Sequence, residues 1–262
     1  MNSTDTKYTN HTIFEELNYY VNFYESLSNS VMSFATKGTT AVANMDTYVY
    51  MSMRSTLESI NLVLKNGNLN DAYALLRKYY DSVMINAYTN LYINQNSGIA
   101  DFYVTEINNW LHGKKPLPRM SKMAKYLNNS SSLSKINELI DLDRRYEDIR
   151  DRCNDNMHYN FFALILLNDG RVYLKERFQH LEQLRNDIRD VFILNIAYIL
   201  TINEHYMVSS DYLDHLNLGM SPPESSQYWV APFIQEMANK VLLKERPDIL
   251  ELLKRSTNME LS

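Results

Sequence analysis

Residues 12–36 read TIFEELNYYVNFYESLSNSVMSFAT, and this stretch indicates the fold class. It opens on Thr12-Ile13-Phe14-Glu15, the pattern of a capping box, in which a hydroxyl and a carboxylate satisfy each other's free backbone N–H groups. Apolar side chains then recur every three or four residues, the spacing of one side of an α-helix: Phe14, Leu17, Val21, Tyr24 and Leu27. The stretch therefore predicts an amphipathic helix, which Gly38 ends.

The same period continues along most of the chain. It predicts long helices over residues 40–66, 70–92, 97–111 and 176–207, with shorter helices between and after them. Only 6 Gly and 6 Pro occur among 262 residues, fewer than a sheet with many turns needs, and 45% of the residues are hydrophobic, enough for a core. We therefore expect an all-α protein, an antiparallel bundle of long helices joined by short connections.

Two segments depart from this pattern. Asn168-Asp169-Gly170-Arg171 is a tight-turn sequence, which fits either a short β-hairpin near residues 168–174 or a link that breaks a helix. The last fifty residues have a different residue pattern, because a loop that contains Gly and Pro at 219–223 precedes an apolar helix. We expect residues 1–208 to form the helical bundle and residues 209–262 to form a C-terminal helical appendage packed on the same domain.

Composition excludes several classes of function. A net charge of −5 does not suit a protein that coats nucleic acid through a general basic field. One cysteine and six scattered histidines cannot build a structural zinc site, and there is no Gly-rich phosphate loop or His-Glu-x-x-His pair. The single Cys153 forms no intrachain disulfide, and the apolar runs are too short to span a bilayer. We expect a cytoplasmic protein with no membrane contact, no metal and no cofactor.

Polar and charged residues are concentrated between Arg144 and Asn160, in the sequence RRYEDIRDRCNDNMHYN. One interpretation is a solvated helix face with pairs four residues apart, such as Asp148 with Arg152. However, Asn154-Asp155-Asn156 is poor helix material, because short polar side chains compete for the backbone, and we expect the helix to break there. His158 would then stand between this break and a buried helix over residues 161–167.

At this point the sequence resembles the HEPN superfamily, helical-bundle proteins of prokaryotic defence and toxin systems, many of which are ribonucleases. The family's mark is an arginine followed, after four to six residues, by a histidine at the start of a core helix. Here Arg152 and His158 have that spacing, with five residues between them. Cys153 follows the arginine where the family more usually has Asn, Asp or His, and Asn154 is the expected substitute.

A second resemblance lies upstream, in residues 68–92. Ala72, the run Leu75-Leu76-Arg77, and Asp81 look like the Ala-x-x-Leu-Leu-Arg-x-x-x-Glu helix of abortive-infection relatives in that superfamily, with Asp81 in the place of the glutamate. The alternative is an ordinary amphipathic helix with an Arg77–Asp81 pair worth about 0.3–0.5 kcal/mol. Together the two resemblances cover residues 40–207.

The motif suits RNA cleavage without a metal. The ribose 2′-hydroxyl attacks the adjacent phosphorus, so one proton must leave this hydroxyl and another must reach the leaving oxygen. A histidine, whose ordinary pKa is about 6.5, can perform either transfer, and a guanidinium can stabilise the charged transition state. Six residues turn a regular helix by about 600°, which leaves Arg152 and His158 about 120° apart. Either the helix break brings them together or two subunits pool their residues, as the resemblance implies.

The leading hypothesis is a HEPN-type, metal-independent endoribonuclease that acts as a homodimer. We expect catalytic roles for Arg152, His158 and Asn154, substrate contacts from Arg150, Asn156 and Tyr159, and secondary roles for Arg77 and Asp81. The resemblance implies RNA as substrate and an antitoxin or another defence-system protein as partner. Two alternatives stay open. One is a catalytically silent HEPN-like module that binds a protein or a nucleotide, and the other is an unrelated helical structural protein.

Overall fold

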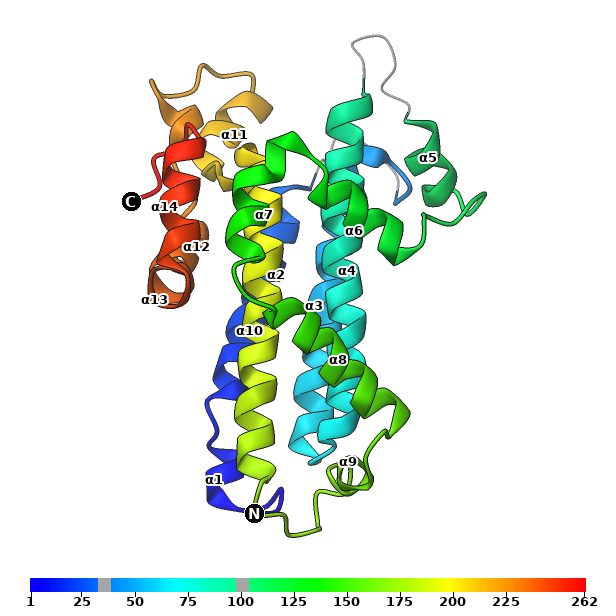
Figure 1. Ribbon diagram of the computed structural model, residues 1–262. Helices are drawn as coiled ribbons and strands as arrows, with labels where there is room; N and C mark the ends of the chain where they lie inside the picture. The colour runs from blue at the N-terminus through cyan, green and yellow to red at the C-terminus, as the bar shows by residue number, and fades with distance from the viewer. Residues whose placement is uncertain (33–38, 98–103) are drawn as a thin grey trace. The chain divides into compact units, whose positions relative to one another are not determined.

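The computed structural model describes residues 1–32, 39–97 and 104–262 (Figure 1). Within these ranges the chain is helical, and the β-structure amounts to an isolated antiparallel bridge between Val208 and Val230. This confirms the all-α prediction. The expected end of the first helix at Gly38 lies outside the described residues, as do residues 98–103 of the helix predicted over 97–111. Ser97 itself is described and is not helical. In the described ranges, no helix combines the length and the apolar character that crossing a membrane requires.

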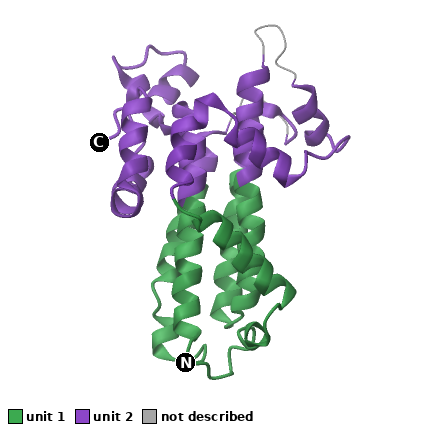
Figure 2. Cartoon of the chain, viewed as in Figure 1, with its two compact units in different colours: residues 1–25, 49–83, 143–192 green, residues 26–48, 84–142, 193–262 purple. Residues whose placement is uncertain are grey.

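The chain forms two compact units, coloured separately in Figure 2. Unit 1 comprises residues 1–25, 49–83 and 143–192, and unit 2 comprises residues 26–48, 84–142 and 193–262. Four long helices contribute residues to both units: α2 (Ile13–Ser30), α3 (Met45–Lys65), α4 (Leu69–Asn96) and α10 (Arg177–Ile202). Unit 1 is completed by three helices: α1 (Thr6–Thr9), α8 (Arg145–His158) and α9 (Phe162–Leu166). Residues 209–262 belong to unit 2 together with earlier segments.

Unit 1 is an antiparallel bundle with an aromatic core. In Figure 1, α3 and α8 run opposite to α2, α4 and α10. The ring of Tyr20 stacks on Phe192 with 4.4 Å between centroids, and the hydroxyls of Tyr24 and Tyr79 lie 2.6 Å apart. Buried hydroxyls require such partners, because an unpaired polar group in a core costs about 1–3 kcal/mol. The many tyrosines of the sequence thus serve partly as core residues.

The start of α2 differs from the predicted capping box. The backbone N–H of Ile13 donates to Nδ1 of His11, 3.2 Å away, so a histidine side chain serves the first turn of the helix. The hydroxyl of Thr12 accepts a hydrogen bond from Arg185 at 2.9 Å. The predicted amphipathic stripe is nevertheless present, since its members from Leu17 to Leu27 are buried.

Residues 168–174 form turns, so the predicted short β-hairpin is not found there. The reason is the buried side chain of Arg177, which ties this segment to the bundle. Its guanidinium donates at 2.8–3.3 Å to four backbone carbonyls, those of Gly67, Leu167, Asp169 and Val172. The backbones of Gly67 and Gly170 approach so closely that a Cβ on Gly67 would lie 2.5 Å from Cα of Gly170. The Asp-Gly sequence therefore marks a backbone contact instead of a hairpin turn.

Unit 2 is built from shorter helices around the remaining parts of the long ones. Its α-helices are α5 (Thr105–Leu111), α6 (Met120–Asn128), α7 (Ser134–Ile140), α11 (Ser210–Asn217), α12 (Pro232–Met237), α13 (Leu243–Glu245) and α14 (Pro247–Ser256). Short 3-10 turns occur at η1 (Val42–Asn44), η2 (Ser131–Leu133), η3 (Glu204–Met207) and η4 (Ser226–Tyr228), and η5 (Ala238–Leu242) is a π-helical segment.

A buried carboxylate stands at the centre of a polar network in unit 2. Asp46 accepts hydrogen bonds of 2.9 Å from the side-chain amides of Asn86 and Asn90 and one of 2.6 Å from the hydroxyl of Tyr206. Burial raises the pKa of Asp46 to about 6, although these three donors act in the opposite direction. Asp46 is therefore a titratable core group in the range between pH 4 and pH 7.

Candidate functional site

Helix α8 carries the Arg-x5-His motif and is continuous from Arg145 to His158, so the predicted break at Asn154-Asp155-Asn156 is wrong. The side chains of Asn154 and Asn156 form hydrogen bonds that leave the helical backbone intact. The amide of Asn156 donates to the carbonyl of Arg152 four residues earlier at 2.8 Å, and its Oδ1 accepts from Asn70 at 3.0 Å. Tertiary contacts thus outweigh the weak helix preference of these residues.

Arg152 is held by a buried carboxylate on α10. Its Nε lies 2.8 Å from Oδ2 of Asp187, and its Nη2 lies 2.6 Å from Oδ1. The side chain of Asp187 is 1% exposed, whereas that of Arg152 is 33% exposed. Partial burial would lower the pKa of Arg152, but the hydrogen bonds and the charge of Asp187 outweigh it and raise the pKa. The pair of Asp148 with Arg152 that the sequence suggested is thereby replaced by a pair between helices.

Two buried groups surround this ion pair. Cys153 is fully buried, and burial together with the charge of Asp187 raises the pKa of its thiol to about 12. Such a thiol stays protonated at neutral pH and acts as a small apolar core group. Burial and the nearby Asp187 also raise the pKa of Tyr73 well above its usual value. Cys153, the residue after the motif arginine, therefore packs in the core of this chain.

The opposite flank of α8 faces α4. Nη1 of Arg77 donates to Oδ1 of Asn154 at 3.0 Å, and Nε of Arg77 donates to Asp81 at 3.0 Å. The Arg77–Asp81 pair that the sequence predicted is therefore present, and its arginine also reaches the motif helix. Asn154 is half-buried, so Arg77 fixes its side chain at the edge of the surface.

Arg150, Asn154 and His158 share one side of α8. Four residues advance a helix by about 400°, so each of these side chains is offset by only about 40° from the one before. His158 is exposed and ends the helix, and Arg150 and Asn154 are half-buried. Within the described ranges no carboxylate lies within ion-pair distance of Arg150. Arg152, by contrast, lies about 120° around the helix from His158 and is about 9 Å away along its axis.

The residue after His158 has an unusual backbone. Tyr159 adopts the left-handed conformation at φ 50°, a region that favours glycine. The N–H of Asn160 donates to the carbonyl of Asp155 at 3.1 Å and the N–H of Tyr159 to that of Asn156 at 3.4 Å, the bonds of a Schellman motif. The motif helix therefore ends abruptly, with His158 in its last turn and the Tyr159 ring exposed.

Helix α9 is exposed, so the predicted buried helix over residues 161–167 is wrong. It spans only Phe162–Leu166 and has no buried residue. Five apolar side chains in and before it are 44–74% exposed, the most exposed being Phe162, and we call them together the α9 surface: Met157, Tyr159, Phe161, Phe162 and Ile165. In the run 161–167 the one buried residue is Leu167, which is 2% exposed. Exposed apolar clusters of this kind commonly mark interaction surfaces.

No family model, no curated protein and no solved structure matches this chain. A search of residues 1–32, 39–97 and 104–262 finds no group of three or more His, Cys, Asp and Glu side chains placed to hold a metal ion. The candidate site is therefore defined by its geometry.

Sequence reasoning missed Asp187, although a signal for it exists. Leu184, Asp187 and Val191 follow one another at spacings of three and four residues, so the aspartate occupies a core position of an apolar helix. A carboxylate there needs a cationic partner, because an unpaired buried charge is strongly unfavourable. The pattern could have identified Asp187 as a buried partner of an arginine, but not which arginine.

Proposed function

We propose that this protein is a metal-independent endoribonuclease of HEPN type, with His158 as the general acid or base. The observation that carries the proposal is the exposed position of His158 at the end of an intact helix. On the same side of this helix lie Asn154, which Arg77 fixes, and Arg150. A buried histidine packed against apolar neighbours would have favoured a silent module.

Within one chain this side of α8 offers a phosphate two kinds of contact. Arg150 has donors that no carboxylate of the described residues occupies, and the amide of Asn154 can orient a phosphate oxygen or the attacking hydroxyl. His158 takes the proton of the ribose 2′-hydroxyl as the oxygen attacks phosphorus, and the bond to the 5′-oxygen breaks. The products are a 2′,3′-cyclic phosphate and a free 5′-hydroxyl, and the leaving oxygen receives a second proton. A single histidine cannot accept the proton of the 2′-hydroxyl and donate another proton to the leaving oxygen in the same step.

We propose a homodimer, because a second subunit would supply the missing groups. The continuous helix leaves Arg152 and His158 of one chain on different flanks of α8, so a bend in that helix does not unite them. A twofold axis near the end of α8 would bring the partner's motif against the first and provide a second histidine. Arg152 would then act across the interface, through its Nη1 and the exposed part of its guanidinium.

The α9 surface is our candidate for this interface. It follows His158 directly in the chain, and its five apolar side chains are exposed in the single chain. Burying these side chains against their copies would stabilise the dimer by about 25 cal/mol for each Å² of apolar area removed from water. The interface would then lie where the proposed catalytic residues are. Tyr159 belongs both to this surface and to the expected substrate contacts.

We further propose a cytoplasmic setting in prokaryotic defence or a toxin–antitoxin pair, with the antitoxin or another defence protein as partner. Support for the compartment comes from the buried, free Cys153. The context itself follows from the resemblance of the Arg-x5-His motif, and the neighbouring genes would test it.

The decisive experiment is RNA cleavage by the purified protein in the presence of EDTA. We expect products with 2′,3′-cyclic phosphate ends, and His158→Ala should reduce the rate by about 10²–10⁴-fold, the usual contribution of a general acid or base. Because His158 is exposed, this variant should keep the melting temperature of the wild type. Cleavage that requires added Mg²⁺, or that His158→Ala leaves unchanged, would refute the proposal.

One observation favours a second candidate, a catalytically silent module that binds a protein. The two hydrogen bonds to Asp187 occupy one edge of the Arg152 guanidinium, and this reduces its capacity to bind phosphate. An apolar α9 surface would equally suit another protein chain. If the wild type never cuts RNA but is a stable dimer or captures a partner through this surface, the silent module is the better description.

A further inference from the structure

The stretch of unit 2 from residue 107 to residue 137 contains six Lys and Arg residues and no Asp or Glu, in a chain whose net charge is −5. Five of these cations fall within residues 114–125 and are exposed, and we call them together the basic segment: Lys114, Lys115, Arg119, Lys122 and Lys125. Within the described ranges none of the five forms an ion pair with a carboxylate. The acidic average of the chain therefore conceals a local concentration of positive charge.

The backbone at the start of the basic segment is fixed by the end of α5. The N–H of Lys114 donates to the carbonyl of Asn109 at 2.8 Å and the N–H of Gly113 to that of Trp110 at 3.0 Å, the bonds of a Schellman motif. Gly113 has a φ of 66°, the left-handed conformation that this helix end requires. The two prolines of the following Lys-Lys-Pro-Leu-Pro sequence restrict the loop further. The first two lysines of the segment are therefore held on a restricted backbone.

Helix α6 carries the other cations on its solvent side. Lys122 and Lys125 are three residues apart and are neighbours on the helix surface, and Arg119 stands at the N-cap position. The opposite side of the helix is buried through Met123 and Leu127. The packing of these two apolar residues thus orients α6 with its cations toward water.

Tyrosines of α4 hold both α5 and α6, which lie beside α4 in Figure 1. The hydroxyl of Tyr88 donates to Glu106 on α5 at 2.7 Å. On α6, the ring centroid of Tyr126 lies 5.3 Å from that of Tyr88 and 5.6 Å from that of Tyr92. The two helices on either side of the lysine loop are therefore attached to the same part of unit 2. Glu106, the last carboxylate in the sequence before the basic segment, is occupied by Tyr88.

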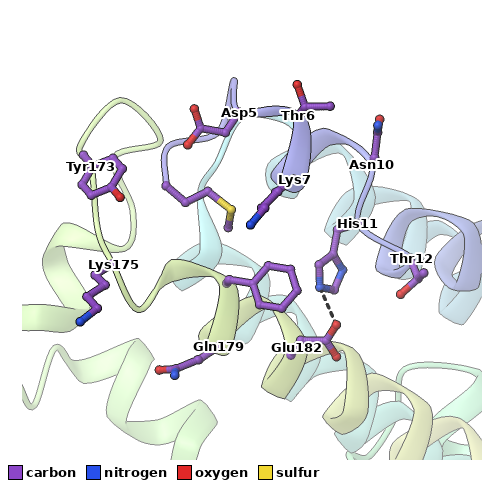
Figure 3. A pocket seen from close by; sticks show the side chains of 12 residues that line it. Asp5, Thr6, Lys7, Asn10, His11, Thr12, Tyr173, Lys175, Gln179 and Glu182 are labelled. Carbon is purple, nitrogen blue, oxygen red and sulfur yellow. Dashed lines mark ion pairs between the residues drawn. The ribbon is translucent and has the colours of Figure 1, made fainter.

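The lysines at a cavity in unit 1 are arranged differently. This cavity of about 870 Å³ is lined by residues within 5–12 and 173–182 (Figure 3). Lys7 extends toward its middle, whereas Lys175 points away from it. Glu182, which lies 2.9 Å from Nε2 of His11, lines the same cavity. These two exposed lysines form no joint site for an anion, and they provide a matched control for the basic segment.

The ligand that suits the basic segment is a chain of repeated anions in water. No large apolar side chain is exposed among the described residues 104–141, so the segment offers nothing to insert into a lipid bilayer. Four of its five cations are lysines, which bind as point charges, whereas the fork of an arginine is better suited to a defined carboxylate. Two half-buried aromatic residues, Trp110 and Tyr126, border these cations in the sequence. Cations combined with aromatic rings are typical of surfaces that bind single strands of nucleic acid.

We propose that the basic segment binds the phosphate backbone of a single nucleic-acid strand, without reading its bases or its sugar. Each cation neutralises one phosphate, and the release of counterions from the strand drives binding. The inference goes beyond the proposed catalytic site, because no residue of the Arg-x5-His motif belongs to the segment. It does not rest on the nuclease proposal, since a strand can be held without being cut.

Fluorescence anisotropy of the full chain with a labelled single-stranded DNA of about 20 nucleotides tests the proposal. DNA has no 2′-hydroxyl, so the proposed nuclease mechanism cannot cut it. For five phosphate contacts, the logarithm of the association constant should fall with the logarithm of the salt concentration at a slope of about −3.5. Lys122→Gln/Lys125→Gln should weaken binding about tenfold near 0.15 M salt and reduce this slope by about 1.4. Lys7→Gln/Lys175→Gln removes the same charge from unit 1 and should bind as the wild type does.

Other polyanions complete the experiment. RNA of the same sequence, measured on the His158→Ala variant to keep it uncut, should bind within about threefold of the DNA, because only phosphates are contacted. The proposal is overturned if no strand binds, if the control variant weakens binding as much as the α6 variant, or if RNA binds more than a hundredfold more tightly than DNA. Tighter binding of duplex DNA, of polyglutamate or of vesicles with phosphatidylserine would also overturn it. Circular dichroism of each variant establishes that a loss of binding is not a loss of fold.

The two proposals fail separately. Strand binding through the basic segment without RNA cleavage in EDTA would refute the nuclease and leave this inference standing. Cleavage in EDTA that Lys122→Gln/Lys125→Gln leaves unchanged, together with no binding of the DNA strand, would refute this inference and leave the nuclease standing.

Discussion

The guanidinium of Arg152 and the carboxylate of Asp187 form a two-pronged salt bridge that joins α8 to α10, with N–O distances of 2.8 and 2.6 Å. Gln183 donates a further hydrogen bond of 2.9 Å to the same carboxylate. Because Asp187 is buried, its charge depends on Arg152 for compensation. The motif arginine therefore stabilises the bundle, and any catalytic role must be measured against this structural one.

Arg152→Ala should lower the free energy of unfolding by about 2–3 kcal/mol, less than the loss of a fully buried pair because Arg152 is one-third exposed. Arg152→Lys should lose less, since an ammonium still compensates Asp187. The double variant Arg152→Ala/Asp187→Asn should recover part of the loss, because it removes the unpaired charge. Urea denaturation measures all three, and Arg150→Ala serves as the control. An Arg152→Ala variant as stable as the wild type would contradict this account of the pair.

Phe162→Ser should convert the proposed dimer into a monomer with little loss of stability, because this ring is 74% exposed in the single chain and belongs to the α9 surface. Light scattering should give twice the chain mass of 30.8 kDa for the wild type and that mass itself for the variant. Leu218→Ser is the matched control, since Leu218 is equally exposed at 74% and lies in unit 2. A wild type that is monomeric at working concentration would remove the dimer from the proposal.

The helical architecture could be predicted from the sequence because it depends on local periodicity. The stripe from Leu17 to Leu27 and the few glycines and prolines each indicate helices without knowledge of the rest of the chain. The errors concern contacts between distant residues. Arg177 ties the link at residues 168–174 to the carbonyl of Gly67, 110 residues away in the chain, and the helix continues through Asn156 because Asn70 binds its side chain. Neither contact leaves a mark in the local sequence.

The arrangement of the candidate site residues could be predicted only in part. Spacing alone placed Arg152 and His158 about 120° apart on a regular helix, and the intact α8 has that geometry. The sequence could not show that Arg152 turns toward Asp187, since the partner lies 35 residues away. The exposed α9 was missed because an apolar run of seven residues has the same composition whether it is buried in the same chain or left for a partner.

Tyr159→Gly should raise the free energy of unfolding by about 0.5–1 kcal/mol, because glycine adopts the left-handed conformation without steric cost. The same change removes an exposed ring that we expect to contact substrate, so the KM for RNA should rise while the helix end is preserved. Tyr159→Ala is the control, since it lacks the ring but keeps the backbone strain. A glycine variant no more stable than the alanine variant would contradict the strain argument, and two variants both less stable than the wild type would show that the tyrosine side chain itself supports this helix end.

The raised pKa of Asp46, in unit 2, predicts that the stability of the protein depends on pH. Its folded-state pKa of about 6 exceeds the ordinary value of 3.8, so between these pH values the folded protein binds more protons than the unfolded chain. This group therefore contributes stability at low pH that is lost as the pH rises through about 6. Asp46→Asn cannot ionise, and its melting temperature relative to the wild type should increase between pH 4.5 and pH 7.5. Thermal denaturation at several pH values measures this difference, and a constant difference would contradict the assignment.

Mixing two inactive variants would test whether the motif works across a dimer. Arg152→Lys keeps the charge beside Asp187 but loses the planar guanidinium, and His158→Ala lacks the proton-transfer group, so each homodimer should cleave RNA poorly. If a site needs only Arg152 of one subunit and His158 of the other, unfolding and refolding an equal mixture should restore about one quarter of wild-type activity, because about half of the dimers are mixed and each has one complete site. Refolding each variant separately and then combining them is the control. If the mixture stays inactive, either the two residues act within one chain or each site needs the histidines of both subunits. If Arg152→Lys alone is fully active, the arginine that binds phosphate is instead Arg150, on the same side of α8 as His158.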